Sequence, residues 1–161
     1  MVIVEYSRAG RSSVSEDGRL RAEDLPLGRV IELGDHHVTR EEIISFATQW
    51  DPQSFHVDEV FARETVFGDV IGSGLHTMAV FQRLAVAGAY RHWAVVAGRA
   101  IREVSLTSPL RPDTTVHATL TVDSVVPHSE QRALVSKTGR VMDGDGLLMT
   151  IHVDSYVLRR A

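Results

Sequence analysis

The segment Gly74–His92 constrains the fold more than any other part of the chain. It is predicted to form one long helix with little polar face, because its apolar residues are Leu75, Met78, Ala79, Val80, Phe81, Leu84, Ala85, Val86, Ala87 and Ala89. A helix that is apolar nearly all round is buried on most sides. In a chain of 161 residues, a sheet wrapped around that helix is the natural cover.

Most of the remaining chain is predicted to form strands. In the clearest one, 116–126, Val116, Ala118, Leu120 and Val122 alternate with polar residues, which is typical of a half-buried strand. Further strands are expected at Arg29–Val38, 99–107, 132–141 and 147–158. These elements predict an α+β fold in which an antiparallel sheet wraps a long central helix.

The length fits a single domain, which we place at residues 28–161. Residues 1–27 are polar and rich in Gly, Ser and Arg, and are expected to form an N-terminal arm or extended lead-in with little core of its own. A solvated tail is favoured over an arm that clasps a partner.

Composition excludes several classes of function. There is no Cys, so disulfides, thiol catalysis and Cys-based zinc sites are absent. The eight His residues are scattered without an H-E-x-x-H pair, and Leu147 takes the third ligand position of a calcium loop begun by Asp143. We therefore expect no metal or other cofactor, and a hairpin turn at Asp143–Gly146.

Charge and hydropathy also limit the partners. The net charge of −4 comes without a basic patch, so a nucleic-acid partner is not expected. No stretch reaches the roughly 18–20 apolar residues of a membrane span, and the first residues do not resemble a signal sequence. These features predict a cytoplasmic protein without a membrane partner.

A helix is predicted to begin after Thr39, which is a suitable N-cap, with Glu42 completing a capping box. Its apolar face comprises Ile43, Ile44, Phe46, Ala47 and Trp50. A second short helix is expected at Asp58–Arg63, with Phe61 and Ala62 pointing inward.

Between these two helices lies the candidate acid–base pair. Pro52 disfavours helix at the preceding residue, so Asp51 is predicted to lie at a helix end and His56 on the turn beyond it. A carboxylate and an imidazole five positions apart on a rigid turn suit proton transfer. The alternative is that both residues are structural: Asp51 caps the turn, and His56 is a partly buried imidazole.

The tract Gly72-Ser73-Gly74 precedes the long helix. Ser73 is either a simple N-cap or part of an anion site, since free N–H groups at a helix start favour a negative oxygen. The tract lacks the G-x-S-x-G spacing of a hydrolase nucleophile.

Taken together, these segments resemble the MaoC-like dehydratase family, and within it the (R)-specific enoyl-CoA hydratases of the hot-dog fold. Asp51 and His56 keep the family's spacing of acid and base, while Gln53 and Ser54 replace the family's Asn and Pro. Phe67–Gly74 matches the family's approach to the central helix, and Pro109-Leu110-Arg111-Pro112 its turn before the last strands. The resemblance covers about residues 28–158.

The resemblance implies a hot-dog fold, a homodimer or higher homo-oligomer, and reversible addition of water to a 2-enoyl thioester carried by CoA or acyl carrier protein. Asp51 and His56 would share the catalytic water, and Gly74 would bind the thioester oxygen, with Ser73 and Gln53 beside the substrate. One departure is Gln82, where some hydratases place a Ser on the helix. Arg99, Arg102 and Arg111 are minor candidates for contacting the carrier's phosphates.

Two rival functions share this fold. A hot-dog thioesterase would hydrolyse the same substrate class with a carboxylate and an oxyanion hole. A non-catalytic acyl-binding subunit would explain the replacements at Gln53 and Gln82.

Overall fold

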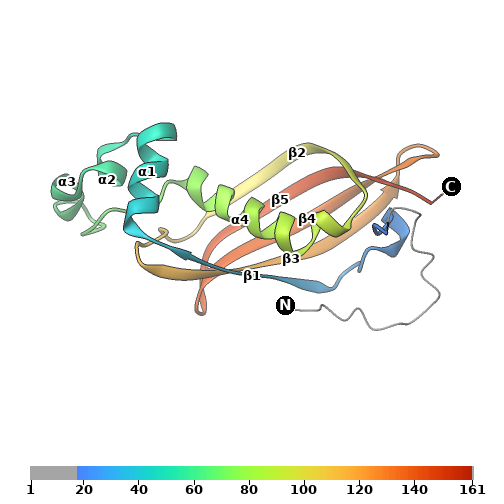
Figure 1. Cartoon of the computed structure of the whole chain (residues 1–161), viewed down its shortest axis with the longest axis horizontal. Coiled ribbons are helices and arrows are strands. Elements are labelled where there is room, and N and C mark those ends of the chain that lie inside the picture. Colours follow the sequence, from blue (N-terminus) through green and yellow to red (C-terminus); the bar gives the residue numbers. More distant parts are fainter. Residues whose placement is uncertain (1–17, 161) are drawn as a thin grey trace.

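The long helix lies along one face of a five-stranded antiparallel sheet (Figure 1). The computed structural model describes residues 18–160. The strands are β1 (Val30–Val38), β2 (Val95–Leu106), β3 (Thr114–Pro127), β4 (Arg132–Asp143) and β5 (Gly146–Leu158), in the order β1-β3-β4-β5-β2. The α-helices are α1 (Arg40–Trp50), α2 (Ser54–Val57), α3 (Glu59–Arg63) and α4 (Gly74–Gly88); Ala22–Asp24 and Tyr90–His92 are short 3₁₀ helices, η1 and η2. The predicted hot-dog arrangement is confirmed.

The sheet forms as its sequence pattern predicts. On β3, Val116, Ala118, Leu120 and Val122 are fully buried and face the helix. The β4–β5 hairpin turns between Asp143 and Gly146, which are paired across the ladder, and this confirms the predicted turn. β2 begins four residues earlier than predicted and lies at the sheet edge beside β5.

Close packing of α4 on the sheet depends on Gly139. A Cβ at this position would lie 2.2 Å from Cζ of Phe81, so the absence of a side chain on β4 makes room for the Phe81 ring. Two apolar residues of the helix, Leu75 and Val86, remain 52% and 44% exposed. The helix is therefore buried on its sheet side and open along part of its outer side.

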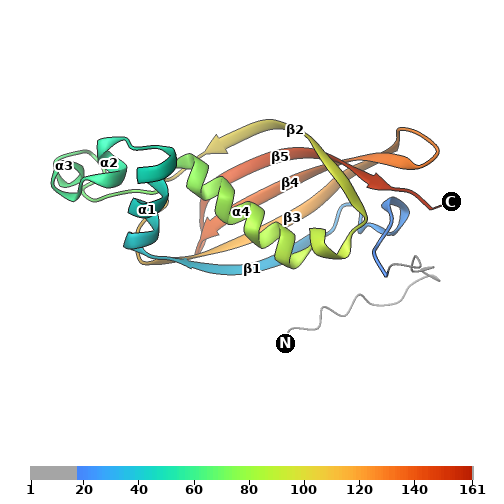
Figure 2. The ribbon, with the colours of Figure 1, turned by 45° about the horizontal axis from the view of Figure 1, so that its top comes forward.

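The helices α1, α2 and α3 lie beyond one end of the sheet (Figure 2). Thr39 caps α1 by accepting from the Glu42 N–H, and Asp58 caps α3. The predicted capping box forms only in half, because the Glu42 carboxylate contacts two histidines instead. The prediction that Phe61 points inward is wrong, because it is 49% exposed. Trp50, expected on the apolar face of its helix, is also 69% exposed.

Part of the predicted lead-in packs on the core. Leu20 bridges to Trp93, and Ala22 and Leu25 are buried, so this stretch is not a solvated tail. The rest of the predicted arm, residues 1–17, lies outside the described residues. None of the helices within residues 18–160 is long and apolar enough to span a membrane.

Candidate active site

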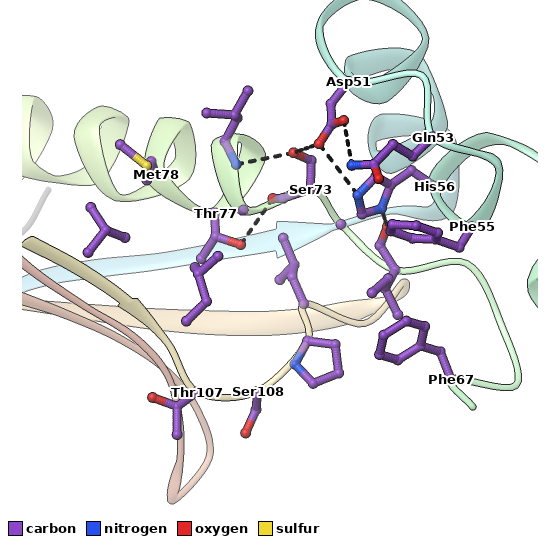
Figure 3. Close-up of a pocket in the computed structure, with 18 residues that line it drawn as sticks. Asp51, Gln53, Phe55, His56, Phe67, Ser73, Thr77, Met78, Thr107 and Ser108 are labelled. Carbon is purple, nitrogen blue, oxygen red and sulfur yellow. Dashed lines mark hydrogen bonds and ion pairs between the residues drawn. The ribbon is translucent and has the colours of Figure 1, made fainter. Parts of the chain in front are cut away.

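The end of α1 places Asp51 at the mouth of a cavity. The helix stops at Trp50, and Asp51 leaves the helical conformation with φ −157° and ψ 69°, as expected for a residue before Pro52. The cavity has a volume of about 670 Å³ and lies between this corner, the start of α4 and the end of β2. Figure 3 shows the side chains that line it.

Three groups surround the Asp51 carboxylate (Figure 3). The Ser73 hydroxyl donates to Oδ2 at 2.6 Å, and the Gln53 amide donates to Oδ1 at 2.8 Å. The His56 Nε2 lies 3.5 Å from Oδ2. The hydrogen bond from Ser73, followed by that from Gln53, lowers the pKa of Asp51 below its usual range, so the carboxylate stays ionised near neutral pH.

The imidazole of His56 is buried and oriented by the backbone. It belongs to the short helix α2, and its Nδ1 lies 2.6 Å from the Ile71 carbonyl oxygen. Because a carbonyl only accepts, this contact assigns the proton to Nδ1. In its neutral Nδ1–H tautomer, the ring presents the lone pair of Nε2 toward Asp51, where it can accept a proton.

The first turn of α4 supplies backbone donors. The Ser73 oxygen accepts from the Leu75 N–H at 3.2 Å, which confirms Ser73 as the N-cap. The Gly74 N–H has no hydrogen-bond partner among residues 18–160. A Cβ on Gly74 would lie 2.4 Å from Cδ1 of Leu106, so a side chain at this position would have to displace the exposed tip of Leu106. An anionic oxygen suits this free donor at the positive end of the helix.

The remaining cavity walls are mostly apolar and come from segments distant in sequence. Met78 of α4, Val104 and Leu106 of β2, and Phe67 all line the cavity. Leu110 closes its floor, where the Leu110 carbonyl accepts from the Gly72 N–H at 2.8 Å. Sequence reasoning missed these walls, although Pro109–Pro112 had been singled out as a turn.

The connection from α3 to α4 is held in place by two arginines. Arg40 donates to both Asp69 oxygens, at 2.6 and 2.8 Å, and this contact lowers the pKa of Asp69 to about 2. Arg111 donates to the Phe67 carbonyl at 2.6 Å. Both contacts fix the loop whose Ile71 carbonyl orients His56.

The structure separates the sequence-predicted residues into two groups. Asp51, Gln53, His56, Ser73 and Gly74 all line the one cavity. Gln82 is outside it, on the wall of another cavity further along α4.

The three arginines suggested for phosphate contacts are all engaged within the chain. Arg111 bonds to Phe67, Arg102 pairs with Asp154 at 3.1 Å, and Arg99 donates to the Tyr156 hydroxyl at 3.1 Å.

A second acid–base cluster went unnoticed in the sequence. The Glu42 carboxylate contacts Nε2 of His36 at 2.9 Å and Nε2 of His76 at 3.0 Å, and His76 stacks on Phe46. Burial is the main cause that lowers the pKa of His76, although Glu42 opposes it. This cluster joins β1, α1 and α4, and so fixes the helix of Asp51 against the helix of Gly74.

Comparison with known proteins agrees with this architecture. A profile of the MaoC-like domain matches residues 24–143. The chain belongs to the MaoC-like dehydratase family. The family includes hydratases and dehydratases, and the acid–base corner lies within the matched region.

Individual relatives of this MaoC-like chain support the assignment. The crystal structure of a MaoC-like dehydratase from Rhodospirillum rubrum is similar, with a TM-score of 0.77, 31% identity, and coverage of 88% of this chain and 99% of that one. The (R)-hydratase from A. caviae involved in PHA biosynthesis shares the fold, with a TM-score of 0.63, 20% identity, and coverage of 83% and 97%. The uncharacterized protein YdeM of Bacillus subtilis (strain 168) is 28% identical over 94 residues, which are 58% of this chain and 67% of YdeM.

No cluster of three His, Asp or Glu side chains among the described residues has the geometry of a metal site.

Proposed function

We propose that this MaoC-like protein is an (R)-specific enoyl thioester hydratase, which adds water reversibly to a 2-enoyl thioester and gives a 3-hydroxyacyl thioester. The observation that carries the proposal is the 3.5 Å approach of two proton acceptors, Asp51 Oδ2 and His56 Nε2, beside a free backbone donor at Gly74. Membership of a hydratase and dehydratase family supports the reaction class.

The pair of acceptors suits a bound water. An ionised carboxylate and an unprotonated Nε2 have no hydrogen to share, whereas a water can donate one hydrogen to each. The water oxygen then presents a lone pair to the β-carbon of the enoyl group. One group of the pair removes a proton from the water, and the proton is returned to the α-carbon on the same face, which gives syn addition. Positioned proton transfer of this kind contributes typically ~10²–10⁴ in rate.

The Gly74 N–H serves the thioester oxygen. As the water oxygen bonds to the β-carbon, the electrons of the C=C bond shift toward the thioester carbonyl, and negative charge builds on its oxygen in the enolate. A backbone donor at the start of α4 is fixed in place, so it stabilises the charge without reorganisation. The Ser73 hydroxyl is committed to Asp51, so its role is to position the carboxylate. Gln53 has a similar role on the other oxygen.

The acyl group would be carried by CoA or acyl carrier protein, which binds outside the cavity. The proposed reaction uses no redox or metal cofactor. The protein would act in the cytoplasm as a homodimer or higher homo-oligomer. An edge strand with exposed apolar residues, Val96 and Ile101 of β2, supports self-association.

A single assay tests the proposal. Purified protein is incubated with crotonyl-CoA while the absorbance of the conjugated enoyl group and the release of free thiol are followed together. Loss of absorbance without thiol, with a 3R product on chiral analysis, is expected. Thiol release would identify a thioesterase instead. The absence of both over a range of chain lengths would leave the non-catalytic acyl-binding subunit.

A further inference from the structure

A second cavity, of about 610 Å³, continues from the candidate active site along α4. The two cavities share Leu75 and Met78 in their walls. The same strand, β2, lines both cavities: Val104 borders the first, and Ile101, three residues earlier, borders the second. Figure 2 shows α4 crossing one face of the sheet, with β2 as the edge strand at the top of the view. The two cavities are thus successive parts of one groove between α4 and β2.

The wall between the two parts is a side chain that moves easily. Met78 is only partly buried, and an unbranched thioether has several accessible rotamers. From Gly74 to Gln82 the helix rises about 12 Å, which is the length of an extended acyl chain of medium size. A thioester whose carbonyl lies at Gly74 would therefore extend its chain past Met78 into the second cavity.

The inner end of this groove holds a buried ammonium group. Lys137 of β4 is 2% exposed and lines the second cavity. Its Nζ donates to the Ser155 hydroxyl at 2.5 Å and lies 4.6 Å from the centre of the Tyr90 ring. An ammonium has three N–H donors, and Ser155 is its only oxygen partner within residues 18–160. Burying a charged group with unfilled hydrogen bonds is costly, so the site favours an acceptor that enters with a ligand.

The nearby charges favour an anion. Asp154 is the one carboxylate among the described residues that line this cavity, and its Oδ1 lies 3.1 Å from the Arg102 guanidinium. Arg99 lies at the rim and donates to Tyr156. Burial lowers the pKa of Lys137 to about 8, although Asp154 opposes this, so the amine is mostly protonated at neutral pH. Among the residues that line this cavity, two cations, Lys137 and Arg99, thus outnumber one carboxylate.

We propose that this cavity receives the far end of the acyl chain and that Lys137 selects chains ending in a carboxylate. The inference rests on the proposed function, because it assumes that the thioester end of the substrate lies at Gly74. The substrates would be 2-enoyl thioesters of dicarboxylic acids, with the free carboxylate paired to the Lys137 ammonium and the methylene chain packed against α4 and β2. Apolar walls with a few convergent polar groups are typical of such ligand sites.

The test uses 2-enoyl-CoA substrates of increasing length, each made with either a methyl group or a carboxylate at the far end. At the length that reaches Lys137, the full-length protein is expected to hydrate the carboxylate-ended chain with at least a tenfold higher kcat/KM. Lys137→Met keeps the aliphatic stem and removes the charge, and should abolish this preference. Arg140→Met removes the same charge from an exposed position on the same strand and should leave the preference unchanged.

Binding is measured separately, so that the two proposals can fail independently. Calorimetry with the saturated acyl-CoA of each kind, which cannot be hydrated, should show tighter binding of the carboxylate-ended chain that is lost in Lys137→Met. If no enoyl thioester is hydrated but this binding preference is found, the hydratase proposal fails and the role of Lys137 stands. Equal binding of both chains at every length, or a preference that survives Lys137→Met, would overturn the inference about Lys137.

Discussion

The two ends of the groove differ in how their polar groups are held. At the Asp51 end, the carboxylate accepts from Ser73 and Gln53 and faces His56, whose other nitrogen contacts a backbone carbonyl. At the far end, Lys137 has one oxygen partner among the described residues and two aromatic rings. A network with its partners in place orients groups for chemistry, whereas an under-coordinated charge is suited to meeting a ligand.

Removing either member of the acid–base pair should have the largest effect. We expect Asp51→Asn or His56→Ala to lower kcat by roughly 10²–10⁴-fold, because each loses a proton acceptor from the shared water. Steady-state hydration of crotonyl-CoA measures this. Asp51→Asn should still bind a carboxylate-ended acyl-CoA more tightly than a methyl-ended one, because Lys137 lies in the other cavity. Undiminished activity in either variant would refute the assignment of these residues.

Filling the space at Gly139 should act on stability alone. A Cβ there would lie 2.2 Å from the Phe81 ring, and overpacking of a core typically costs about 1–3 kcal/mol. We expect Gly139→Ala to lower the free energy of unfolding, measured with urea, by this amount. A matched Gly139→Ala/Phe81→Leu protein should recover part of the loss. If the double variant is no more stable than Gly139→Ala, contact with Phe81 is not the cause.

Loss of the Ser73 hydroxyl should lower the rate of hydration without abolishing it. Ser73→Ala removes the main cause of the lowered pKa of Asp51, so that pKa rises toward its ordinary value. Activity should fall about tenfold, the value of one hydrogen bond to a charged group, and the acid limb of the pH–rate profile should move to higher pH. Gln53→Ala should shift the limb in the same direction by less. An acid limb that does not move would show that Asp51 is not the group titrating there.

Removing the ion pair between Arg40 and Asp69 should have the smallest effect, a small loss in the free energy of unfolding. Arg40 lowers the pKa of Asp69 to about 2, so Asp69 stabilises the fold above the ordinary carboxyl pKa and loses this contribution as the pH falls toward 2. Asp69→Asn should cost about 1 kcal/mol or less at pH 7, because both side chains are about a third exposed. Urea unfolding at pH 7 and near pH 2 should show a difference from the unaltered protein only at pH 7. A difference of equal size at both pH values would contradict this account.

Much of the fold was predictable because it follows from local patterns. The alternation on β3 and the helical segment beginning at Gly74 were correctly identified, and so was the cap at Thr39. Trp50 and Phe61 were misplaced because helical periodicity shows which residues share a face, but not whether another element covers that face.

The corner that holds Asp51 and His56 was predictable to the same extent. The spacing of Asp51 and His56 around Pro52 identifies an acid and a base on one turn, and Gly74 identifies a helix start. The contact between Ser73 and Asp51 spans 22 residues, and its direction, from hydroxyl to carboxylate, depends on how α1 packs against the start of α4. The Glu42 link to His36 and His76 was unpredictable for the same reason, since three separate elements contribute one side chain each.

The order of polar, apolar, Gly and Pro residues was therefore enough to predict a helix wrapped by an antiparallel sheet and an acid–base turn beside its first residue. These features depend on backbone conformation and on neighbours within a few positions. The groove, its apolar walls from β2, and the burial of Lys137 beneath Tyr90 came from packing between distant segments. On the sequence alone Lys137 is an ordinary basic residue in a strand, because only the sheet register and the position of α4 place its ammonium away from water.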